Sequence, residues 1–174
     1  QMRFIAHADL GFEEDAVVLI PVGSHDSKMS ALKEQFLVTP GVEQVSLCFG
    51  APASENNWGT SFRFDNRTEP EVFSVQFKGA DSDYVATFEL DLRTGRNLLP
   101  SDTVREFLVN ETLVDKLGIS PEEMLGRPIA FNSDEFTGTV VGVVRDFHDQ
   151  PLRVRINPIF IASSASHYTT YAVR

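Results

Sequence analysis

Residues 105–131 read REFLVNETLVDKLGISPEEMLGRPIAF, and they contain most of the local signals that decide the fold. The apolar residues 107–109 predict a short strand, and Asn110 directly after them is a residue type that caps helix N-termini well. In the helix that would follow, apolar residues recur on one face. Gly118 then stands where a helix C-terminus favours a left-handed residue. The stretch therefore predicts a strand that leads straight into a capped helix.

A second, very short helix is predicted immediately afterwards. The sequence SPEE at 120–123 has the residues of a capping box with proline at the first helical position, and Gly126 ends the helix. Two strands follow, at 127–131 and 137–147, on either side of a polar turn. Valine occupies most of 140–144, and such a run is typical of a strand that is covered on both faces.

The remainder of the chain is also mixed α and β. A nearly continuous apolar run at 16–22 predicts a buried strand, and Asp81 is expected to cap a helix that carries Tyr84, Val85 and Phe88. The fourteen phenylalanines lie mostly at inward positions, so they predict a packed aromatic core. The other predicted elements are a helix at 27–38 and strands at 45–49, 62–64 and 73–77.

Composition excludes several classes of protein. With 15 Lys and Arg against 25 Asp and Glu, the net charge of −10 disfavours a surface for nucleic acid or anionic lipid. Cys48 is the only cysteine, so an internal disulfide is impossible. No window approaches the roughly 20 apolar residues that a membrane-spanning helix needs.

Candidate catalytic residues are few. Asp146, His148 and Asp149 place an imidazole between carboxylates at the end of a strand, which is one corner of a possible hydrolase or metal site. A solvated turn commonly carries the same residues, and no second His or Cys lies at ligand spacing. Residues 24–26 (Ser-His-Asp) are better explained by helix capping, and a phosphate-binding loop is absent. We therefore predict no catalytic residue, no metal ligand and no cofactor.

Trp58 is the one residue singled out as a possible contact with a partner. The sequence SENNWGT at 54–60 puts this sole tryptophan in a polar, turn-forming stretch, where an exposed aromatic ring is costly without a partner. The alternative is that the ring folds back over its own part of the domain. Both interpretations stay open at the level of the sequence.

Several of these blocks together resemble one family. LVNETLVDKLG, LGRPIAF, VVGVVRDFHDQPL and NPIFI occur in the order and spacing of the MacB-like periplasmic core domain of FtsX/MacB-type ABC transporter permeases. Upstream, TPGVEQVSLCFGAP at 39–52 and the segment from Asp81 to Arg96 also match landmarks of that family. Each block alone is an ordinary strand or helix signal, whereas the ordered set is specific.

The resemblance implies an α+β fold with two lobes in a single extracytoplasmic domain, 1–174. A membrane-proximal β-α-β lobe would comprise about 13–90 and 164–174, and an inserted distal α+β lobe would comprise about 91–163. The resemblance also implies a position between two transmembrane helices, on the periplasmic side of the bacterial inner membrane. Residues 1–10 would then extend the first transmembrane helix out of the membrane. The alternative is a frayed helix with a cloning remnant. In the family, a further helix and strand follow the point where this chain ends.

The function implied is non-catalytic. Such a domain would couple ATP hydrolysis by a cytoplasmic ATPase to movement of a periplasmic substrate or partner protein, within a homodimeric or paired permease. Two alternatives come from other classes of protein. One is a free-standing envelope module that binds a small ligand between its lobes, and the other, weaker one is a hydrolase with its site near His148.

Overall fold

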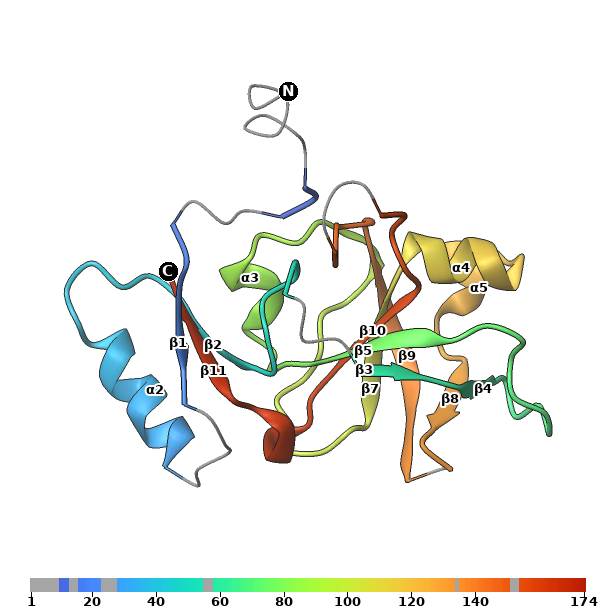
Figure 1. The fold of residues 1–174 in the computed structure, drawn as a ribbon, viewed down its shortest axis with the longest axis horizontal. Helices are drawn as coiled ribbons and strands as arrows, with labels where there is room; N and C mark the ends of the chain where they lie inside the picture. Colours follow the sequence, from blue (N-terminus) through green and yellow to red (C-terminus); the bar gives the residue numbers. More distant parts are fainter. Residues whose placement is uncertain (1–9, 13–15, 23–27, 55–57, 134, 151–153) are drawn as a thin grey trace.

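The computed structural model describes residues 10–12, 16–22, 28–54, 58–133, 135–150 and 154–174. Figure 1 shows an α+β arrangement, with a small sheet beside helix α2 at one side and a larger curved sheet at the other. No helix in these ranges has the length and apolar character needed to cross a membrane. The elements are β1 (Val18–Pro21), α2 (Met29–Leu37), β2 (Val45–Cys48), β3 (Trp58–Thr60), β4 (Phe62–Phe64), β5 (Val75–Gly79), α3 (Tyr84–Thr87), β6 (Leu92–Gly95), β7 (Glu106–Asn110), α4 (Glu111–Leu117), α5 (Pro121–Met124), β8 (Pro128–Phe131), β9 (Phe136–Val144), β10 (Ile159–Ala162), the 3-10 turn η1 (Ala165–His167) and β11 (Thr170–Val173).

The small sheet has three strands in the order β1-β11-β2. The central strand, β11, is antiparallel to both neighbours, so β1 and β2 run parallel with α2 between them in sequence. Helix α2 packs on one face of this sheet. Phe36 of α2 meets Tyr171 of β11 edge to face, with 5.3 Å between the ring centroids. This β-α-β unit confirms the prediction for the first part of the chain.

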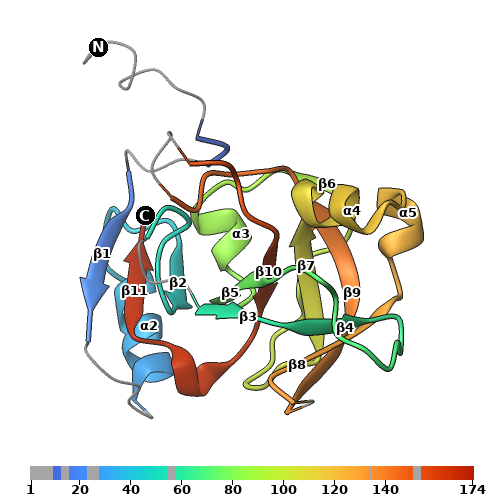
Figure 2. The ribbon, with the colours of Figure 1, turned by 45° about the vertical axis from the view of Figure 1, so that its right-hand side comes forward.

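The larger sheet has eight strands and is nearly closed into a barrel. Its path is β3-β5-β10-β7-β9-β8-β4, and β6 pairs with β9 at the side. The two outermost strands, β3 and β4, are separated in sequence by Ser61 alone, so the chain itself joins the two edges (Figure 2). The predicted aromatic core is confirmed inside this sheet by five rings that are at most 2% exposed, those of Phe62, Phe77, Phe107, Phe131 and Phe160.

The two sheets meet where β5 of the barrel approaches β2 of the small sheet. Cys48 and Ala80 form an isolated β-bridge, and the Phe49 N–H donates to the Gly79 carbonyl at 2.8 Å. Helix α3 packs between the sheets, where Tyr84 and Phe88 are at most 1% exposed. Backbone hydrogen bonds and a shared apolar cluster therefore connect the two halves of the molecule.

The local signals in 105–131 are confirmed in detail. The Asn110 side chain accepts a hydrogen bond from the Leu113 N–H at 3.2 Å and so caps α4, which ends at Gly118 in a left-handed conformation with φ +69°. Ser120 and Glu123 form the predicted capping box at the start of α5. These features follow from residues close in sequence, which is why the sequence alone identifies them.

The prediction of a buried strand at 16–22 is half wrong. The strand exists as β1, but it is an edge strand, and Val18 is 62% and Leu19 44% exposed. β11 pairs with one edge of β1, and β1 stands at the end of the strand order β1-β11-β2. An apolar run indicates a strand without indicating its position in a sheet, and here it lies at the edge.

Two other expectations need correction. The strand expected at 73–77 starts at Val75 as β5, and it pairs with β10 and β3 of the barrel. Sheet pairing therefore crosses the predicted boundary between the lobes at 90/91, and that division stays a prediction. The helix expected at Asp81 begins only at Tyr84, with Asp83 at its N-cap position.

Candidate functional site

Trp58 lies at the start of β3, where the sequence predicted a turn. Its half-buried ring meets Phe77 edge to face at 5.5 Å and Phe131 at 6.3 Å between centroids. The His167 ring lies tilted against it at 5.3 Å. These contacts hold the indole on its own barrel, which is the alternative that the sequence left open. Contact between its exposed part and a partner stays a prediction.

The carboxylates of the Asp146, His148 and Asp149 corner have structural partners. Asp146 accepts hydrogen bonds from the Thr112 N–H at 2.8 Å and the Thr112 hydroxyl at 2.7 Å, at the first turn of α4. Asp149 is 1% exposed and accepts from the Asn157 amide at 2.8 Å. No three His, Cys, Asp or Glu side chains gather as metal ligands in the described part of the chain. The carboxylates therefore fix the loop after β9 onto α4 and onto the segment before β10.

Two buried titratable side chains lie near the joint between the sheets. Burial raises the pKa of Cys48 to about 12, so its thiol stays protonated at neutral pH. Burial lowers the pKa of Lys78 to about 8, although the negative charge of Asp149 acts in the opposite direction. The Lys78 ammonium lies 3.4 Å from the Ala51 carbonyl.

The Ser-His-Asp sequence at 24–26 lies outside the described residues.

Asp81 is the polar centre of the joint, whereas sequence reasoning predicted only that it caps a helix. Its carboxylate accepts hydrogen bonds from the Ser46 hydroxyl at 2.7 Å and the Leu47 N–H at 2.9 Å, both on β2. The Lys33 ammonium of α2 lies 2.7 Å away and also pairs with Asp83. One carboxylate thus ties α2 and β2 of the small sheet to the segment that leaves the barrel at β5. These partners are 34 or more positions away, so no local pattern reveals them.

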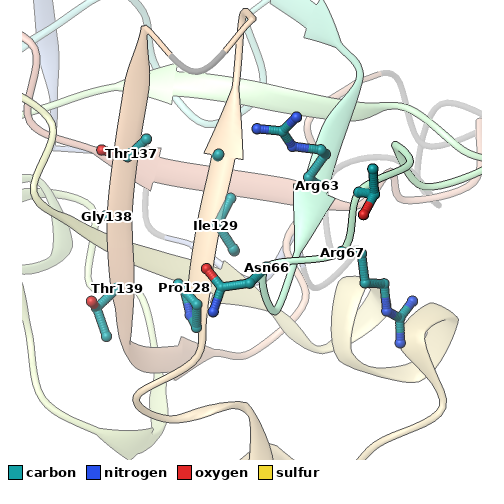
Figure 3. A pocket seen from close by; sticks show the side chains of 10 residues that line it. Arg63, Asn66, Arg67, Pro128, Ile129, Thr137, Gly138 and Thr139 are labelled. Atoms are coloured by element: carbon teal, nitrogen blue, oxygen red, sulfur yellow. The ribbon is translucent and has the colours of Figure 1, made fainter.

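A groove lies on the outward face of the barrel, over β4, β8 and β9 (Figure 3). Its volume is about 530 Å³, and its lining includes Arg63, Asn66, Thr137 and Thr139. Strand alternation in 62–64 places Phe62 and Phe64 inside and Arg63 outside. Strand alternation therefore predicts that the Arg63 side chain points outward. The sequence does not reveal its position opposite the two threonines.

Comparison with known proteins connects this fold to a class of transporters. No protein-family model and no curated protein matches the sequence. Among solved structures, the periplasmic region of MacB from Actinobacillus actinomycetemcomitans is similar, with TM-score 0.63 and 13% identity over 98% of this chain and 79% of that one.

Two further structures are similar over 91% of this chain. The extracellular domain of the ABC-type transporter YknZ from Gram-positive bacteria has TM-score 0.59 and 16% identity, with 82% of that chain covered. A domain of a protein described as a permease, from Porphyromonas gingivalis, has the same TM-score and identity with 72% covered. The chain therefore has the fold of the extracytoplasmic domains of MacB-type ABC transporter permeases.

Proposed function

We propose that this chain is a non-catalytic extracytoplasmic domain of an ABC transporter permease, and that it transmits movement driven by a cytoplasmic ATPase. The observation that carries the proposal is the likeness to extracytoplasmic transporter domains over 91–98% of the chain. The ordered sequence blocks between residues 39 and 161 support the same assignment independently. The domain would lie on the outer side of the inner membrane, in a permease that works as a pair.

The joint between the sheets supports a mechanical role. A movement that enters through the small sheet can pass to the barrel only if the two are connected stiffly. The bridge between Cys48 and Ala80 and the hydrogen bonds of Asp81 supply such a connection. Packed interfaces of this kind transfer displacements rather than absorb them. The domain would therefore move as a lever with its two sheets in fixed orientation.

The distribution of exposed apolar side chains supports membership of a larger protein. Nine large apolar residues are exposed within the described ranges, and six of them belong to β1, α2 and their ends: Val18, Leu19, Val22, Leu32, Leu37 and Val38. Exposed apolar side chains concentrated in two consecutive elements favour contact with other polypeptide. In the proposed permease this side, within the membrane-proximal lobe of 13–90 and 164–174, would face flanking polypeptide of the same protein between its transmembrane helices.

A movement measurement on the full-length permease tests the coupling. Spin labels at Val72→Cys, a fully exposed loop position, would report the distance between two paired copies, and native Cys48 is too buried to react. A doubly labelled domain with Val38→Cys and Val72→Cys reports its internal distance. We expect the distance between copies to change between nucleotide-free and ATP-bound states while the internal distance stays constant. An unchanged distance between copies would contradict coupling, and a changed internal distance would contradict the lever.

Trp58 is proposed as part of the surface that meets a periplasmic partner protein. The half-buried Trp58 ring lies against that of His167, at the side of the barrel formed by β3. With a partner identified by co-purification, Trp58→Phe keeps most of the aromatic packing and removes the indole N–H and part of the ring. We expect weaker partner binding with little change in melting temperature. Equal affinity of Trp58→Phe, Trp58→Ala and the unchanged protein would exclude the contact.

A further inference from the structure

The segment 163–169 leads from β10 of the barrel to β11 of the small sheet, and we call it the strap. It contains the 3-10 turn η1 and is held by bonds of its own. Ser164 Oγ lies 2.8 Å from His167 Nδ1, and the Ser164 N–H donates to the Tyr168 hydroxyl at 3.3 Å. The strap is therefore a compact turn rather than an extended linker.

One side of the strap is fixed to the barrel by the His167 ring. Its centroid lies 5.3 Å from that of Trp58. The rings of Phe136 and Phe77 follow at 5.9 Å and 6.4 Å. The His167 Cβ also lies over Gly79 of β5, where an added Cβ would be 3.7 Å away. Rings at such separations attract each other beyond the effect of burial alone, so this cluster holds the imidazole against the barrel.

The next two residues of the strap are fixed to the small sheet. Tyr168 is 3% exposed and belongs to the apolar cluster formed by α2, β2 and β11. The Thr169 N–H donates to the Cys48 carbonyl at 3.0 Å, and the Thr169 carbonyl accepts from the Val22 N–H at 2.8 Å. His167 and Tyr168, which are adjacent in sequence, are thus anchored in different halves of the molecule.

We propose that the strap couples the surface at Trp58 to the small sheet, so that the packing of Trp58 controls how firmly the two sheets are held together. The indole supports His167, and Tyr168 passes that support to the small sheet. Loss of the indole leaves His167 with less packing and lets the small sheet open more often. Coupling between two sites is reciprocal, so ordering of Trp58 by a bound molecule stabilises the small sheet in turn.

In the proposed permease, a partner bound at Trp58 would therefore stiffen the lever. That step rests on the proposed function, whereas the coupling itself is a property of the domain alone. Failure of the coupling would leave the location of the domain, and with it the transporter assignment, untouched.

Hydrogen exchange in the isolated domain tests the coupling without an ATPase or a partner. Backbone amides would be followed by NMR in β11, with β7 in the middle of the barrel as the reference. In Trp58→Ala and in His167→Ala we expect exchange in β11 to accelerate relative to β7 by about two- to tenfold, the factor that corresponds to loss of one aromatic contact. The double variant should match His167→Ala, because Trp58 acts through His167. Unchanged exchange in β11 in either single variant, or effects that multiply in the double variant, would overturn the proposal.

Phe73→Ala is the matched control. Phe73 is also a partly buried ring on the barrel, but it meets Phe62 at 5.5 Å between centroids and the Lys116 ammonium of α4 at 5.2 Å, away from the strap. We expect the ratio of exchange in β11 and β7 to stay unchanged, and an acceleration as large as in Trp58→Ala would refute a specific route. Circular dichroism would confirm folding. Should Trp58→Ala not fold, Trp58→Leu, which keeps a large apolar side chain, takes its place.

Discussion

Removal of the Asp81 carboxylate is the most informative perturbation of the joint between the sheets. In Asp81→Ala, the Leu47 N–H and the Ser46 hydroxyl lose their acceptor, and Ser46 is fully buried. The Asp83 N–H, 3.1 Å from the same carboxylate, also loses its hydrogen-bond acceptor. A buried donor left without a partner costs about 1–3 kcal/mol. Two such groups on β2 give an expected loss of about 2–6 kcal/mol in the free energy of unfolding.

Asp83→Ala is the matched control. Its side chain is 45% exposed and pairs with the same Lys33, so solvent screens the interaction and the expected loss is below about 1 kcal/mol. Urea unfolding would be followed by tryptophan fluorescence, which reports the barrel through Trp58, and by far-ultraviolet circular dichroism, which reports both sheets. For Asp81→Ala we also expect the two transitions to separate, because the barrel loses a tie to the small sheet. A loss no larger than that of Asp83→Ala, with coincident transitions, would refute this account of the joint.

Three further changes test other parts of the structure. Asn110→Ala should lower the melting temperature by several degrees in calorimetry. The reason is that the buried Asn110 side chain, besides capping α4, accepts a hydrogen bond from the Ile159 N–H at 2.9 Å and donates one to the Asn157 carbonyl at 2.8 Å. An unchanged melting temperature would contradict a stabilising role for these hydrogen bonds. Gly95→Ala should strongly lower the free energy of unfolding measured in urea, since its Cβ would lie 2.2 Å from the Val141 carbonyl oxygen. Gly118→Ala, with open space around it, should cost only about 1–2 kcal/mol of backbone strain. Equal losses of stability in the two variants would argue against the close contact at Gly95. Because the pKa of Lys78 is lowered to about 8, the unfolded chain binds more protons than the folded chain between pH 8 and about 10.4. The free energy of unfolding of the natural protein should therefore rise relative to that of Lys78→Met as pH increases through that window. A difference independent of pH would contradict the burial of the Lys78 ammonium.

The sequence predicted the parts of the fold that depend on neighbouring residues. The cap at Asn110, the left-handed Gly118 and the capping box at Ser120 each need only three or four residues to form, and all three are present. Period-two alternation likewise gave β4 its inward phenylalanines.

Pairing over long distances was beyond the same reasoning. The exposure of β1 depends on β11, which lies about 150 residues later, and closure of the barrel depends on β3 and β4 pairing with different strands. The role of Asp81 depends on β2 and α2, so its carboxylate resembled an ordinary helix cap. The groove at Arg63 has the same origin, because its walls come from strands 74 residues apart that only the sheet register brings together.

The most direct test of the central claim is the location of the native protein in its source cells. After fractionation, peptides of this domain and of its flanking regions would be mapped by mass spectrometry, and intact spheroplasts would be treated with protease. We expect the domain within a longer inner-membrane protein, with apolar peptides on both sides, and we expect it to be cleaved from outside the spheroplast. A product of about this length that is free of the membrane would contradict the permease assignment and favour a free-standing binding module.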